Sequence, residues 1–213
     1  MKFQEFKESL TIKNIATLLL GMFLINFGIA YSIQASLGTS PVSSLPYVFS
    51  QFTPLTVGNW TVIVHSTALL LQILILRKDF NPINLGQLLL AVIFGFITDF
   101  AIMVVGTVNC PTYLHQWLYC ILGTVLIGVG VTFEVEANVM MVALEGLGYT
   151  IATKYNKKFG NVKSCQDVII VALAIIISFV AMHKVVGVRE GTVFAAVAVG
   201  QIAKFTKKIV FKK

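Results

Sequence analysis

The sequence predicts an all-α polytopic membrane protein whose six transmembrane helices form two three-helix repeats of inverted topology. Three observations predict this fold class. Hydrophobic residues make up 57% of the chain and charged residues 12%, against roughly 25% charged in an average soluble domain. The mean hydropathy of +0.87 comes from six apolar stretches. The second half of the chain also repeats the first.

The six apolar stretches are the predicted transmembrane helices. About 20 residues are needed to cross a hydrocarbon core of roughly 30 Å, and the second and fifth stretches are slightly short. The predicted spans are residues 15–35, 60–77, 86–106, 115–134, 166–183 and 190–207.

The basic residues predict the orientation of these spans. Every Lys and Arg except Lys184 and Arg189 lies on one predicted side: the N-terminus, the second and fourth connections, or the C-terminal tail. Basic residues collect on the cytoplasmic side of membrane proteins. We therefore expect a multi-pass protein of the cell inner (plasma) membrane with both termini cytoplasmic. The formal charge of +7 then reflects topology and the lipid bilayer, and no nucleic acid is expected as a partner.

The internal repeat divides the chain. Residues 21–75 align without a gap on residues 123–177, and the match resumes when 86–95 is set against 191–200. The pairs Gly58/Gly160 and Asn59/Asn161 are informative because they are not apolar. Each copy holds three spans, so the two copies point opposite ways across the bilayer. We expect a cytoplasmic N-terminus (1–14), a first repeat (15–106), an inverted second repeat (107–207) and a basic cytoplasmic tail (208–213).

Two long connections follow spans 1 and 4. Residues 38–47 are too apolar for an aqueous loop and too rich in Gly, Pro and Ser for a full span, and residues 139–149 are apolar with one acid. Either segment fits an interfacial amphipathic helix. Either also fits a broken or re-entrant segment, which requires that its backbone be buried in protein or line a cavity. Both interpretations stay open from sequence.

Several of these segments resemble the YczE/YyaS/YitT group of bacterial membrane proteins. The resemblance rests on Leu37-Gly38-Thr39-Ser40-Pro41, on Thr56-Val57-Gly58-Asn59, which keeps part of the group's turn before span 2, and on the third span from Gly86 to Asp99. It implies a bacterial inner-membrane protein of about six spans. It implies no substrate and no catalytic residues.

Polar groups within apolar spans are costly and therefore candidates for function. Acids near span ends are considered for a coupling or ion-binding role, and Glu134 and Glu136 could converge with Glu145 on a cavity that binds a proton, Na⁺ or a cationic solute. The alternatives are solvated helix ends and, for Asp99, a structural ion pair with Arg189 or Lys184. Hydroxyls and amides near the broken segments are candidates for substrate binding, with capping of an irregular turn as the alternative. The coupling candidates are Asp99, Glu134 and Glu136. The substrate-binding candidates are Asn26, Thr39, Ser40, Ser43, Ser44, Asn138 and Glu145. Asp167 is expected at the start of span 5, and His65 is expected to pack within span 2.

The leading functional hypothesis is a small secondary transporter or exporter of a small solute, with H⁺ or Na⁺ as the coupling ion. One alternative is a substrate-binding subunit of an energy-coupling-factor importer, although no A-x-x-x-A stripe is evident in span 1. Another is a non-transporting factor that binds a second membrane protein. No nucleophile–base pair, metal-ligand set or cofactor motif is visible, so neither an enzyme nor a cofactor is expected. A homodimer stays open.

Overall fold

The computed structural model describes residues 7–107 and 110–211, and all regular secondary structure in these ranges is helical. Two 3₁₀ turns, η1 (Arg77–Asp79) and η2 (Pro82–Leu85), join α4 to α5. The α-helices are α2 (Ile12–Ala35), α3 (Pro41–Ser50), α4 (Val57–Leu76), α5 (Gly86–Val105), α6 (Tyr113–Glu136), α7 (Ala143–Lys154), α8 (Phe159–Met182) and α9 (Glu190–Val210).

Five helical segments in the described part of the chain are long and apolar enough to cross a membrane. They correspond to the first five predicted spans: Ile12–Ala35, Val57–Asp79, Pro82–Val105, Tyr113–Glu136 and Phe159–Met182. The predicted sixth span coincides with α9, a helix of 21 residues. This helix is less apolar because Lys204, Lys207 and Lys208 lie in its second half.

The fifth predicted span differs from the observed helix at its start. Helix α8 begins at Phe159 rather than at residue 166, and it therefore includes Lys163 and Asp167. The sequence places Asp167 at the start of span 5, but in the structure it lies within α8, more than one turn after the helix begins. It forms an ion pair with Lys163 one turn earlier on the same helix.

Helices α2 and α6 form the most extensive helix–helix contact among the described residues, and glycines make it possible. A Cβ atom added at Gly28 would lie 2.6 Å from the Gly123 carbonyl oxygen, and one at Gly123 would lie 2.6 Å from that of Gly28. Gly21 and Gly130 face each other in the same reciprocal way, at 2.8 and 2.7 Å. Small residues let helix backbones approach closely in membrane proteins. The two helices therefore touch backbone to backbone at two places.

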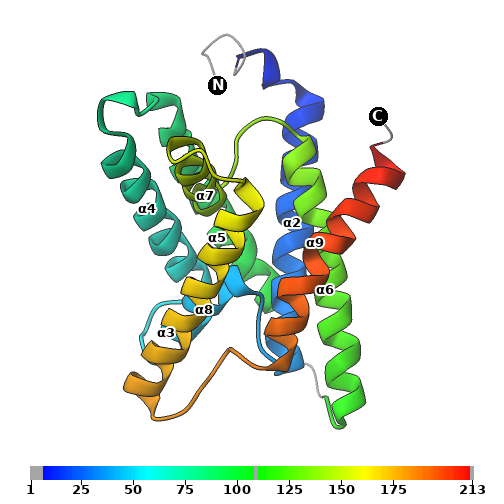
Figure 1. Cartoon of the computed structure of the whole chain (residues 1–213). Coiled ribbons are helices and arrows are strands. Elements are labelled where there is room, and N and C mark those ends of the chain that lie inside the picture. Colours follow the sequence, from blue (N-terminus) through cyan, green and yellow to red (C-terminus); the bar gives the residue numbers. More distant parts are fainter. Residues whose placement is uncertain (1–6, 108–109, 212–213) are drawn as a thin grey trace.

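The two short helices, α3 and α7, lie inside the helical array rather than beyond the ends of the long helices (Figure 1). Each packs against both α4 and α8. Leu144 and Leu147 of α7, for example, join a buried apolar cluster with Leu69 of α4 and Ile170 of α8. Both predicted broken segments therefore contain a short helix that is largely buried in protein.

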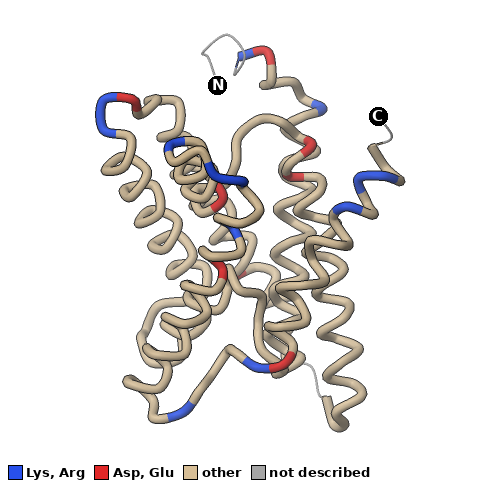
Figure 2. The backbone as a smooth tube through the Cα atoms, in the orientation of Figure 1, with Lys and Arg blue, Asp and Glu red and all other residues tan. Residues whose placement is uncertain are grey.

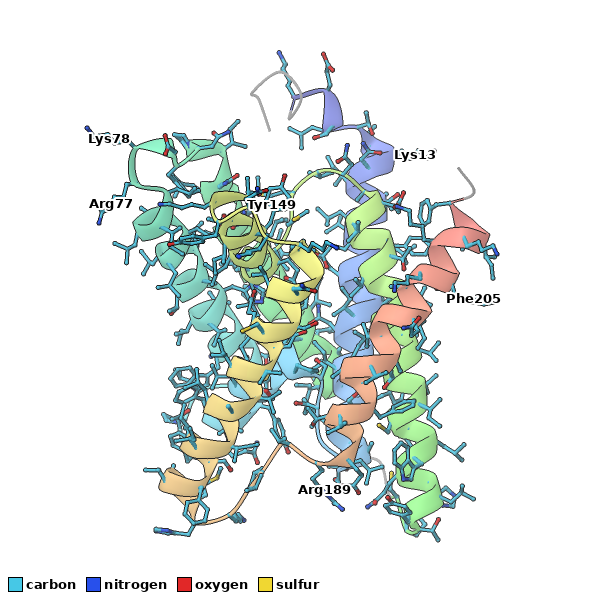
Figure 3. All side chains as sticks on the ribbon, viewed as in Figure 1. Lys13, Arg77, Lys78, Tyr149, Arg189 and Phe205 are labelled. Carbon is cyan, nitrogen blue, oxygen red and sulfur yellow. The ribbon has the colours of Figure 1, made fainter. Side chains whose placement is uncertain are left out.

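Both ends of the described chain lie at the same end of the molecule (Figure 1). Most Lys and Arg residues lie at this end, as Figure 2 shows. Lys13, Arg77 and Lys78 lie there in Figure 3, whereas Arg189 lies at the opposite end. This separation of charge along the helix axes agrees with the distribution expected of a multi-pass membrane protein.

Candidate functional site

The start of α3 gathers four of the predicted substrate-binding residues. Thr39, Ser40, Ser43 and Ser44 are all buried. The hydroxyls of Ser40 and Ser43 lie 2.8 Å apart, and that of Ser44 donates to the Pro41 carbonyl at 2.7 Å. The Thr39 backbone N–H donates to the Gly187 carbonyl at 2.9 Å. The hydroxyls at this uncharged helix start thus bond to one another and to local carbonyls.

The start of α7 is built from charged residues instead. The Lys163 ammonium lies 3.4 Å from Oε1 of Glu145 and 2.8 Å from Oδ1 of Asp167. The three side chains are about one quarter exposed, at 23%, 27% and 24%. The other Glu145 oxygen, Oε2, is buried without a hydrogen-bond partner. Lys163 therefore bridges two acids and leaves an acceptor free.

Glu134 and His65 lie within electrostatic range of this bridge. Glu134, in the last turn of α6, accepts the Val142 backbone N–H at 3.4 Å, and Val142 precedes α7. Glu145 and Lys163 interact electrostatically with both Glu134 and His65. The His65 ring packs on Phe94 with centroids 5.7 Å apart, and its Nδ1 is buried without a partner. We call Glu134, Glu145, Lys163, Asp167 and His65 the charged cluster.

Two predicted coupling residues lie outside the charged cluster. Glu136 forms an ion pair with Lys207 of α9, although it is only two residues from Glu134. Asp99 accepts the Thr56 hydroxyl at 2.6 Å and the Gly58 backbone N–H at 2.8 Å, and so caps the N-terminus of α4.

Arg189, one of the two ionic partners considered for Asp99, forms other contacts. Arg189 pairs with Glu190 at 3.1 Å and donates to the Ser36 carbonyl at 2.9 Å. No ion pair of Asp99 occurs within the described residues. Asp99 therefore forms the hydrogen bonds that cap α4 in place of the ion pair considered from sequence.

The two predicted asparagines lie at different places. Asn26 is fully buried, donates to the Met22 carbonyl at 2.8 Å and accepts the Thr98 hydroxyl, which ties α2 to α5. Asn138 is exposed, has a φ of 51° and lines a cavity beside α7. The structure therefore separates Asn26 from the two helix starts and keeps Asn138 close to one of them.

Three glutamines that the sequence reasoning missed hold α7 in place. Gln72 Nε2 donates to the Ala143 carbonyl and Gln166 Nε2 to the Leu144 carbonyl, each at 2.8 Å. Gln72 Nε2 also donates to Gln87 Oε1 at 2.8 Å. The signal for Gln72 and Gln87 was present in the sequence, because both are uncommon polar residues within predicted apolar spans.

Comparisons with known proteins agree with the membrane assignment. The chain is 28% identical to the uncharacterized membrane protein YczE of Bacillus subtilis over 187 residues, which cover 87% of this chain and 81% of YczE. It is 33% identical to the uncharacterized protein YyaS of the same organism over 120 residues, which cover 56% of this chain and 58% of YyaS. The chain thus spans little more than half the length of YyaS. No solved structure matches.

A family model described as "Family of unknown function (DUF6198)" matches residues 12–208. These residues include every helix from α2 to α8 and nearly all of α9. Together with the two relatives, this match confirms the YczE/YyaS-like resemblance that the sequence motifs indicate. The chain is a membrane protein of several apolar helices that belongs to the DUF6198 family.

Proposed function

We propose that this protein is a secondary transporter or exporter that moves a small solute by alternating access between two inverted three-helix repeats. In this proposal α9 is the sixth span and both termini are cytoplasmic. Inverted repeats allow a carrier to open toward either side, because the two halves can exchange conformations. The supporting observations are the packing of α2 on α6 and a difference between the two halves.

The packing of α2 on α6 supports a two-fold relation between the halves. Gly21 and Gly28 correspond in sequence to Gly123 and Gly130. Gly28 faces Gly123, and Gly21 faces Gly130. Exchanging the two halves maps one of these contacts onto the other, as a two-fold axis between the helices requires.

The observation that carries the proposal is an asymmetry between corresponding helix pairs. In the first half α4 packs on α5, and a Cβ added at Gly58 would overlap the Gly95 carbonyl oxygen. The corresponding α8 and α9 scarcely touch and run apart in Figure 1. Their glycines, Gly160 and Gly200, have nothing within 4 Å of an added Cβ. One half is thus closed and the other open, and in the proposed cycle they exchange these states.

The charged cluster supports coupling to a cation. Uptake of a proton by the cluster, or replacement of the Lys163 ammonium by another cation, would change the charge balance at the start of α7. Because α7 packs on α4 and α8, such a change acts on a helix of each half. We therefore assign the proposed role of H⁺ or Na⁺ to this cluster rather than to Asp99.

Cysteine cross-linking tests the exchange of states directly. We would replace Gly160 and Gly200 by Cys and measure disulfide formation in native membranes. The background would lack the three native cysteines, Cys110, Cys120 and Cys165. If α8 and α9 close as α4 and α5 do, the pair oxidises readily and the bond traps one state.

A matched control uses the outward faces of the same two helices. Val168 and Val197 are 68% and 67% exposed, so a Cys pair at these positions should not form a bond within one molecule. A Gly160/Gly200 pair that oxidises no faster than this control, under all conditions of pH and Na⁺, would contradict alternating access. That result would instead favour a static membrane factor that binds another membrane protein.

A further inference from the structure

A cavity beside α7 contains hydrogen-bonding groups but no charged side chain. Its volume is about 300 Å³, the lower end of the range for small-molecule sites. It lies between η2, α4, α5, α7 and the segment that leads into α7. Its polar lining residues are Gln72, Asn84, Gln87, Asn138, Tyr149 and Thr150. Asp and Glu, Lys and Arg are all absent from its lining within the described residues.

Gln72 and Gln87 form the buried part of this cavity. They are 0% and 4% exposed, and Gln72 Nε2 is occupied by the Gln87 Oε1 and Ala143 carbonyl oxygens. Gln72 Oε1 has no hydrogen-bond partner and is inaccessible to solvent. A buried carbonyl oxygen without a partner is costly. Because the Gln72 side chain lines the cavity, a shift of its flexible amide would bring this unpaired acceptor to a ligand N–H.

Gly146 lets the two amides lie directly on α7. A Cβ added at this position would come within 2.8 Å of Gln87 Nε2 and 3.1 Å of Gln72 Nε2. Because these contacts are with the ends of flexible side chains, an alanine here would displace the amides and leave the helix intact. Gly146 thus sets the position of the hydrogen-bonding groups in the cavity.

We propose that this cavity binds a small uncharged solute through a carboxamide or an equivalent pair of N–H donor and C=O acceptor. The ligand N–H would donate to Gln72 Oε1, and the polar amides and hydroxyls around it would satisfy the ligand carbonyl. A carboxylate is disfavoured, because its oxygens would face the Gln72 oxygen and no cation lines the cavity to compensate. That the bound solute is also the transported solute rests on the proposed function, whereas the binding does not.

Nicotinamide and nicotinic acid test this specificity, because they share a ring and differ in carboxamide against carboxylate. Calorimetric titration of the purified protein in detergent should detect nicotinamide binding and at least tenfold weaker binding of nicotinic acid. Gln72→Met keeps the length of the side chain but removes the acceptor. This variant should bind nicotinamide at least tenfold more weakly, because the ligand N–H is left without an acceptor. Gly146→Ala should also weaken it.

Gln166→Met is the matched control. Gln166 makes the same type of bond to α7, at the Leu144 carbonyl, but does not line the cavity. This variant should bind nicotinamide as the parent protein does. Three results would each overturn the proposal. Nicotinic acid could bind as tightly as nicotinamide, or the two Gln→Met variants could lose the same affinity for nicotinamide. Nicotinamide could also show no binding up to about 10 mM. Cross-linking of Gly160 to Gly200 reports on alternating access separately, so the two proposals can fail independently.

Discussion

Lys163 is expected to be the residue whose loss most destabilises the charged cluster. Lys163→Met leaves Glu145 and Asp167 without the cation that lies 3.4 and 2.8 Å from them. Removing one partner of a fully buried ion pair costs about 3–5 kcal/mol. The three side chains are about one quarter exposed, and solvent screening lowers the cost. We therefore expect a loss of about 2 kcal/mol in the free energy of unfolding.

The assay is equilibrium unfolding in mixed detergent micelles at two pH values. In the variant an uncompensated negative charge lies at the start of α7 at pH 7.5, and lowering the pH reduces the negative charge of the site. The difference from the parent protein should therefore shrink as the pH falls to 5. Lys163→Arg should recover most of the loss. In a double-mutant cycle Glu145→Gln should be less harmful when Lys163 is already Met, because the pair is then absent.

The control for this prediction is the more exposed lysine of another ion pair. Lys207, paired with Glu136, has a side chain that is 61% exposed. Lys207→Met should cost less than about 1 kcal/mol. If Lys163→Met costs no more than Lys207→Met, or if its cost does not change with pH, then the charged cluster does not have the electrostatic role inferred here.

Two further predictions concern helix packing and capping, measured by the same unfolding assay. Gly28→Val should destabilise the protein by about 1–3 kcal/mol, because its side chain would overlap the Gly123 carbonyl. Gly160→Ala, with open space around its Cβ, should be neutral or slightly stabilising, and an equal loss at both glycines would contradict the packing argument. Asp99→Ala should cost about 1–2 kcal/mol, because the Thr56 hydroxyl and the Gly58 backbone N–H at the start of α4 lose their acceptor. Asp99→Asn should cost less, since it keeps an acceptor for Thr56, and equal effects would argue against capping.

The apolar pattern was enough to predict the long helices but not where α8 begins. The first five predicted spans match helical segments that can cross a membrane. Residues 159–165 include Lys163 and are too polar for a hydropathy pattern to assign to a span. They nevertheless form the first turns of α8, where Lys163 pairs with Glu145 of another helix and with Asp167. An ion pair between residues of different helices depends on tertiary packing, which a local hydropathy pattern does not predict.

The sequence predicted only part of the candidate site. The proximity of Glu134 and Glu145 was among the alternatives drawn from sequence, and the structure brings both to the start of α7. Glu136 was grouped with them, but residues two apart on a helix do not share a face. It therefore reaches Lys207 instead. The role of Gln72 depended on the packing of α4 against α7, which the sequence does not specify.

The chemistry of the two halves differs more than their helices do. In the gap-free alignment, each charged member of the cluster corresponds to an uncharged or weakly basic residue of the first half: Ser32, Ser43, Thr61 and His65. The hydroxyls at the start of α3 bond to one another and to a local carbonyl, whereas ion pairs lie at the start of α7. A proton or cation acting at α7 has no equivalent at α3. In an alternating-access cycle it would stabilise one of the two states relative to the other, because a ligand shifts an equilibrium only through a difference in its affinity for the two states. In the proposed cycle, this inequality of charge between the two halves is what would allow a proton or cation to favour one state.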